Sequence, residues 1–151
     1  MIRDTITDDL IKVMLRQLGA SSVKTSPAHI NIAKFDLAPG LRVKYLYEAK
    51  TDNEFFLQRI SPFPIRIGRL YNEQDVISMI TADLKKFESA YNSSNFPKFL
   101  ELMGNVQTFD KEIENLFLFN NVSFDNLDKL HKELEKIHLM IDRIEEESDP
   151  L

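Results

Sequence analysis

Apolar residues recur along the chain with two different periods, and the change falls near residue 71. Before it, residues 41–49 alternate between apolar and mostly charged side chains, which is the period of a half-buried β-strand. After it, apolar residues are spaced three and four apart, which is the period of an amphipathic helix. The pattern therefore predicts a sheet in the first half of the chain and helices in the second.

A short amphipathic helix is expected before the sheet. Its apolar residues recur at helical spacing, and they are Leu10, Ile11, Met14, Leu15 and Leu18. Thr7 is a suitable N-cap, and Gly19 can adopt the left-handed conformation that often ends a helix. Because an apolar stripe on a helix has to be buried against another surface, we expect this helix to pack on the sheet.

The sheet is expected to be an antiparallel meander of three or four strands. The segment 38–41 has proline and glycine at the second and third positions of a turn, as a type II turn requires. Further strands are expected within residues 54–60 and 65–70, on either side of the proline-containing segment 61–64.

The helical part is expected to begin with a long helix after Asn72, which resembles an N-cap. A two-turn helix should follow over residues 96–103, because Pro97 suits a first turn and Gly104 suits a helix end. A further helix is expected after Thr108. Together with the last helix, these segments predict an entirely helical second half.

The last helix has the most regular pattern in the chain. Its apolar residues alternate spacings of three and four over nearly three heptads, and this seam consists of Leu127, Leu130, Leu134, Ile137, Ile141 and Ile144. Two partners fit the seam: the long helix after Asn72, or the same seam in a second copy of the protein. His131 and His138 flank the seam, so a contact between copies would respond to pH near neutrality.

These elements define an α+β protein. An N-terminal helix on a small three- or four-stranded antiparallel meander is followed by a C-terminal helical part with a heptad-patterned last helix. The length of 151 residues and the hydrophobic share of 43% fit a single domain, with the helix and sheet in residues 1–70 and the helical part in residues 71–151.

Cysteine usage and the absence of targeting patterns bound the environment. The chain has no cysteine, so it has no disulfide, thiolate metal site or cysteine nucleophile. No signal-peptide pattern and no bilayer-length apolar run occurs in the sequence. We therefore expect a cytoplasmic protein with no membrane partner.

Charge is distributed unevenly between the two parts. Residues 1–70 contain 11 basic and 7 acidic residues, whereas residues 71–151 contain 8 basic and 17 acidic residues. The basic candidates for partner binding on the outer sheet face are Lys34, Arg42, Lys44, Arg59 and Arg66. The acidic part either neutralises the basic part, within the fold or across a dimer, or imitates nucleic acid toward a basic partner.

Three polar residues of the first predicted hairpin suggest a different chemistry. Asp36, Glu48 and Lys50 resemble, in residue type and spacing, the metal-binding motif of the PD-(D/E)xK nucleases. The resemblance implies a nuclease that depends on a divalent metal. The chain departs from the motif at Phe35, where the family has proline, and the alternation along residues 41–49 is typical of a half-exposed sheet. We therefore favour an ordinary hairpin with these residues on its outer face, and retain the nuclease as an alternative.

No other catalytic pattern is present in the sequence. It contains neither a glycine-rich phosphate loop nor a Gly-x-Ser-x-Gly elbow, and no cofactor is expected. His131 and His138 would lie about 10 Å apart along a helix, too far for one metal ion. The leading hypothesis is a non-catalytic protein-interaction module, such as an adaptor, regulator, chaperone-like or inhibitor protein, that forms a homodimer and binds a protein partner. The alternatives are the nuclease and an acidic nucleic-acid mimic, and binding of nucleic acid by the basic face has weak support because few cations are available.

Overall fold

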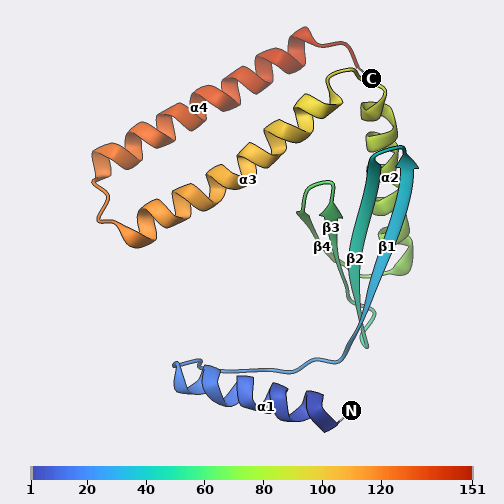
Figure 1. Cartoon of the computed structure of the whole chain (residues 1–151), viewed down its shortest axis with the longest axis vertical. Coiled ribbons are helices and arrows are strands. Elements are labelled where there is room, and N and C mark those ends of the chain that lie inside the picture. The colour runs from blue at the N-terminus through green and yellow to red at the C-terminus, as the bar shows by residue number, and fades with distance from the viewer. Residues whose placement is uncertain (1, 151) are drawn as a thin grey trace.

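The protein consists of a helix, a four-stranded sheet and three further helices (Figure 1). The computed structural model describes residues 2–150, with side chains from residue 7 onward. The elements are α1 (Ile2–Gln17), β1 (Ala28–Ala38), β2 (Leu41–Lys50), β3 (Phe55–Ser61), β4 (Ile65–Leu70), α2 (Glu73–Tyr91), α3 (Phe96–Phe119) and α4 (Phe124–Glu147). The predicted α+β class and the predicted order of helix, sheet and helical part are confirmed.

The sheet is a meander in which each strand pairs antiparallel with the next, in the order β1-β2-β3-β4. Gly40 has a φ of 81° in the turn between β1 and β2, in the left-handed region that the predicted type II turn requires. Across this hairpin Lys34 lies opposite Lys44, and Asp36 lies opposite Arg42. The register fixes which side chains share a face, because residues directly opposite each other point to the same side of a sheet.

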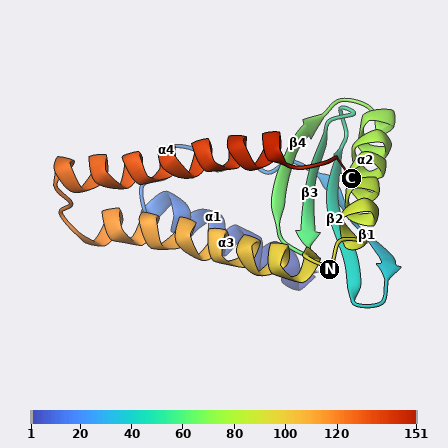
Figure 2. The same ribbon diagram turned by 90° about the horizontal axis from the view of Figure 1, so that it is seen from above.

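The core lies between the sheet and α2, which runs along one face of the sheet in both views (Figure 2). The alternation in β2 and β3 points Val43, Tyr45 and Leu57 inward, and each of them is 0% exposed. Phe87 of α2 and Phe96 at the start of α3 complete this core. The side chain of Asn72 caps α2 by accepting a hydrogen bond from the backbone N–H of Asp75 at 2.8 Å.

Helix α1 does not pack on the sheet; it lies beyond one end of the sheet and is joined to β1 by an extended segment (Figure 1). It precedes the sheet in the chain, as predicted, and Gly19 has the expected left-handed φ of 100° after its last turn. Its apolar stripe is nevertheless open to solvent, with Leu10 at 60% and Leu18 at 81% exposure. Residues 18–27 form no strand, so no backbone ladder holds α1 close to the sheet.

Helix α3 is continuous, which corrects the prediction of two shorter helices separated at Gly104. Glycine in a helix interior costs about 1 kcal/mol relative to alanine. Good helix formers that precede Gly104, among them Leu102 and Met103, offset that cost. Thr108 also donates its hydroxyl proton to the Gly104 carbonyl at 3.1 Å. The helix therefore extends over 24 residues.

Candidate functional site

The seam predicted for α4 is exposed over its C-terminal half. Ser123 caps α4 by accepting a hydrogen bond from the backbone N–H of Asn126. No residue of α4 is buried. The seam residues Leu127, Leu130 and Leu134 are partly buried, whereas Ile137, Ile141 and Ile144 are 49%, 53% and 54% exposed. The structure thus presents the C-terminal half of the seam to solvent.

Helix α3 carries a second seam with the same spacing. Its members are four, three, four and three residues apart, and they are Leu102, Val106, Phe109, Ile113 and Leu116. All except Ile113 are exposed. The sequence pattern did not indicate this seam as a unit, because the expected helix end at Gly104 divided it. The sequence feature that could have revealed this seam is the three-and-four spacing of apolar residues, which continues across Gly104.

Helices α3 and α4 form an antiparallel hairpin that projects from the sheet and stays open (Figures 1 and 2). Their backbones are too far apart to pack along their length. Near the connection between them, Leu116, Val122 and Leu130 line an open pocket of about 360 Å³. The seam of α4 does not pack on α2 in the described part of the chain, although α2 is the long helix that the sequence offered as an intrachain partner.

An open hairpin of this kind lacks the usual source of helix stability. Most of that stability in proteins comes from packing an apolar face, not from intrinsic propensity. Contiguous exposed apolar surface on a protein commonly marks an interaction site. The paired seams therefore constitute a candidate surface for association.

The outer sheet face carries four of the five basic residues predicted to bind a partner. Lys34, Arg42, Lys44 and Arg66 lie on the face opposite the core. Lys34 and Lys44 oppose each other in the register, and like charges placed directly opposite repel. This face therefore has local positive potential at the centre of the first hairpin.

The fifth basic residue, Arg59, lies on the inner face, which corrects its predicted position. In the register of β2 and β3, Arg59 lies opposite Tyr45, a core residue, and the Arg59 side chain is only 6% exposed. Arg59 shares the phase of Phe55 and Leu57 along β3, so the alternation of the sequence contained this information. A buried cation needs a partner, because removing a charge from water is costly.

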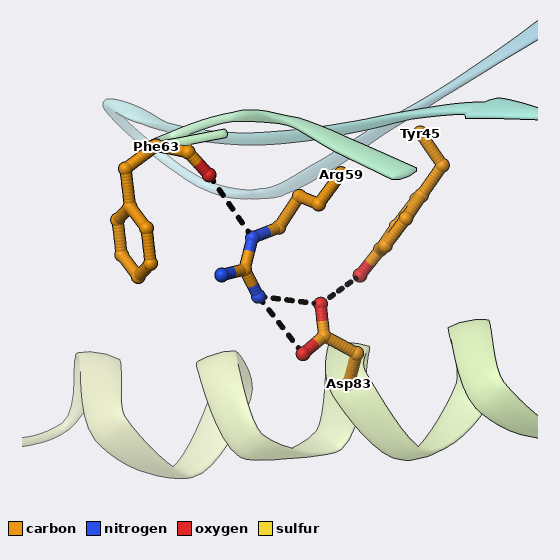
Figure 3. A network of polar contacts seen from close by, with 4 residues as sticks. All are labelled: Tyr45, Arg59, Phe63 and Asp83. Carbon is orange, nitrogen blue, oxygen red and sulfur yellow. Dashed lines mark hydrogen bonds and ion pairs between the residues drawn. The ribbon is translucent and has the colours of Figure 1, made fainter. Parts of the chain in front are cut away.

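Asp83 of α2 is that partner, and it joins the sheet to the helix (Figure 3). Arg59 Nη1 donates to both carboxylate oxygens, at 2.9 and 2.8 Å, and Arg59 Nε donates to the Phe63 carbonyl at 3.2 Å. The Tyr45 hydroxyl donates to Asp83 Oδ2 at 2.7 Å. Burial and the neighbouring Asp83 carboxylate raise the pKa of Tyr45 well above its usual value. No local pattern in the sequence indicates Asp83, because its partners are distant in the chain.

Asp36, Glu48 and Lys50 are not brought together as a metal site. Asp36 lies near the turn of the first hairpin and forms an ion pair with Arg42. Glu48 is six residues farther along β2 than Arg42, or about 20 Å at the rise of a strand. Lys50 forms an ion pair with Glu54 at 2.9 Å. Asp36 is therefore remote from Glu48 and Lys50, and the three residues do not form one site.

The histidines of α4 lie on its exposed surface. His131 Nε2 is 3.4 Å from Glu135 Oε1, and both side chains are exposed. His138 is also exposed. Among the described side chains, no group of three histidine, aspartate or glutamate residues is placed to hold a metal ion.

Comparison with known proteins gives no family for this chain: no family model, curated protein or solved structure matches it significantly. Within residues 2–150, no helix has both the length and the apolar character needed to cross a bilayer.

Proposed function

We propose that the protein is a non-catalytic interaction module that forms a homodimer through the open hairpin of α3 and α4. The observation that carries the proposal is the pair of exposed seams on these two helices. Each seam has the spacing that helices use to pack on one another. Neither seam is fully covered within the described part of the chain, because four of the five residues of the α3 seam and three of the six residues of the α4 seam are exposed.

The size of the hairpin fits a stable dimer. A helix of 24 residues is about 36 Å long at 1.5 Å per residue. Two adjacent helices, each about 10 Å wide, offer roughly 700 Å² per copy, or about 1,400 Å² in total. Specific protein interfaces bury about 1,200–2,000 Å², so a face-to-face pair of hairpins lies within that class.

Charge favours an antiparallel arrangement of the two α4 helices. The C-terminal end of α4 carries the acidic run 145–147, whereas Lys129 and Lys132 lie in its N-terminal half. An antiparallel pair brings each acidic end near the lysines of the other copy. A parallel pair would place the two acidic ends together, where they repel.

Two hairpins related by a two-fold axis form a four-helix bundle. Such an interface is self-complementary, because the same surface of each copy contacts the other. Four-helix bundles bury apolar seams of the kind found on α3 and α4. The partner supported best by these features is therefore a second copy of this chain.

The test compares two equally exposed apolar residues on different faces of α4. Ile141 belongs to the seam and is 53% exposed, while Leu139 points away from it and is 55% exposed. Light scattering should give a dimer for the native protein at micromolar concentration. Ile141→Asp should weaken the dimer by about a hundredfold or more, because it places a carboxylate in an apolar interface.

The matched control is Leu139→Asp, which should leave the dimer within about threefold of the native affinity, since its carboxylate remains in water. A native protein that is monomeric over the whole concentration range would reject the proposal. Equal weakening by the two substitutions would also reject it, because the seam would then have no special part in association.

A further inference from the structure

A pocket opens where α2, the loop after β3 and the start of α3 meet. The rings of Phe63, Phe87 and Phe99 form its apolar walls, and Arg59 and Lys86 contribute its basic groups. The Phe63 and Phe99 rings meet edge to face, with centroids 5.6 Å apart. The pocket has a volume of about 170 Å³.

The Arg59 guanidinium enters this pocket with one nitrogen unpaired. The guanidinium carbon is 4.4 Å from the ring centroid of Phe63 and 4.8 Å from that of Phe87, so both rings pack on the cation. Nε and Nη1 are occupied by Phe63 and Asp83. Nη2 is turned away from Asp83, and no acceptor for it occurs among the described residues (Figure 3).

Because the Arg59 side chain is only 6% exposed, Nη2 reaches little water, and an acceptor supplied from outside the chain would satisfy this donor. In the described part of the chain, every fully buried side-chain nitrogen or oxygen has a hydrogen-bond partner. Nη2 has none, so it is not fully buried. Nη2 therefore keeps some exposed surface, and Arg59 is one of the residues that line the pocket.

The charge of the pocket favours an anion. Asp83 balances Arg59, and the Tyr45 hydroxyl that donates to Asp83 stays neutral. Lys86 forms no ion pair with any described residue, so it contributes an unbalanced positive charge. An anionic oxygen placed in the pocket would accept a charge-assisted hydrogen bond from Nη2 and be attracted to Lys86.

We infer that this pocket binds a small carboxylate with a compact aromatic or branched apolar body. The apolar body would contact the phenylalanine rings, while the carboxylate would face Arg59 Nη2 and Lys86. A cavity of about 150 Å³ is large enough for benzene, so a ring of that size fits the volume available here. This inference does not depend on the dimer, because neither seam of the hairpin lines the pocket.

The probe is phenylacetate, titrated into the full chain while backbone amide resonances are followed by NMR. Saturable shifts should appear at the start of α3 and in the middle of α2. Phenylacetamide has nearly the same shape without the charge, and it should bind at least about tenfold more weakly. Absence of saturable shifts with phenylacetate, or equal binding of the two compounds, would overturn the inference.

Two neighbouring lysines provide a matched pair of variants that leave the buried Arg59 pair intact. Lys86→Gln removes the charge at the pocket and should weaken phenylacetate binding about fivefold to tenfold. Lys85→Gln makes the same change in net charge, but Lys85 lines a separate depression with Gln74 and Ser78. It should change the affinity by less than about twofold. Equal losses in the two variants would show a general effect of surface charge on phenylacetate binding and would reject the pocket as the site.

Discussion

The sheet with α2 and the hairpin of α3 and α4 both carry regularly spaced apolar residues, but these residues are buried to very different extents. In the first region, Val43, Tyr45 and Leu57 are completely removed from solvent. In the second region, α4 has no buried residue. The spacing of apolar residues therefore determines which face of a helix or strand tends to be buried, but it does not determine which surface packs on that face.

Chain connectivity explains the first half of this comparison. Consecutive antiparallel strands are joined by short turns, so each strand finds its partner at little cost in loop entropy. Helix α2 begins directly after β4 and lies along the sheet. The sheet region can therefore complete its core from neighbouring segments, whereas the hairpin has only its own two helices and stays open.

Removal of Asp83 should produce the largest loss of stability. Asp83→Ala leaves the Arg59 charge buried without a partner, and breaking such a pair costs about 3–5 kcal/mol in the free energy of unfolding. Urea denaturation measures this loss. Asp36→Ala removes the carboxylate of an exposed ion pair and should cost no more than about 1 kcal/mol. Similar losses in the two variants would contradict the burial of the Arg59 and Asp83 pair.

A core truncation and a seam truncation should separate the two regions directly. Leu57→Ala should cost about 2–5 kcal/mol in the free energy of unfolding, because it opens a cavity in a packed core. Ile141→Ala should cost less than about 1 kcal/mol when the protein is dilute and monomeric, since the side chain is already half exposed. Denaturation at higher protein concentration should increase the effect of Ile141→Ala and leave that of Leu57→Ala unchanged. If concentration affects both variants alike, the distinction between the regions fails.

The smallest predicted effect concerns Tyr45 and depends on pH. The pKa of Tyr45 is raised in the folded protein, so folding favours its protonated form. The resulting stabilisation is fully present below about pH 10, where an unfolded tyrosine is also protonated, and it is lost as the pH rises through that value toward the folded pKa.

Unfolding measurements on the native protein and on Tyr45→Phe over this pH range isolate the effect. At neutral pH the substitution should cost about 1 kcal/mol, the net value of one hydrogen bond. This difference should shrink above about pH 10, because unfolding lets Tyr45 ionise, whereas phenylalanine at this position cannot ionise. A difference that stays constant with pH would contradict the raised pKa.

Much of the fold could be predicted from the sequence because its signals are local. The alternation in β2, the turn at Gly40 and the cap at Ser123 each depend on a few neighbouring residues. The continuity of α3 could not be predicted in the same way, because a glycine that often ends a helix instead lies inside one. Propensity for a single residue is weaker than the summed preference of the surrounding segment.

The candidate sites were less accessible to sequence reasoning. The seam of α4 follows from periodicity, but whether a seam is covered depends on contacts that periodicity does not contain. The pairing of Arg59 with Asp83 joins residues 24 positions apart, and many other carboxylates were equally available. The phase of Arg59 along β3 was the one local signal, and it indicated the inner face.

The segment 18–27 belongs to no helix or strand and forms the linker between α1 and β1. Residues 18–20 are hydrogen-bonded to the last turn of α1, so the extended part consists of residues 21–27, which reach roughly 25 Å. A helix joined by a linker of this length has an effective concentration in the millimolar range toward any surface of the same chain that it can reach. The stripe of α1 therefore meets apolar surfaces of its own chain at a far higher local concentration than a second protein molecule does at micromolar concentration. Association through any surface that α1 can reach is consequently a competition, and its apparent affinity includes the displacement of this helix.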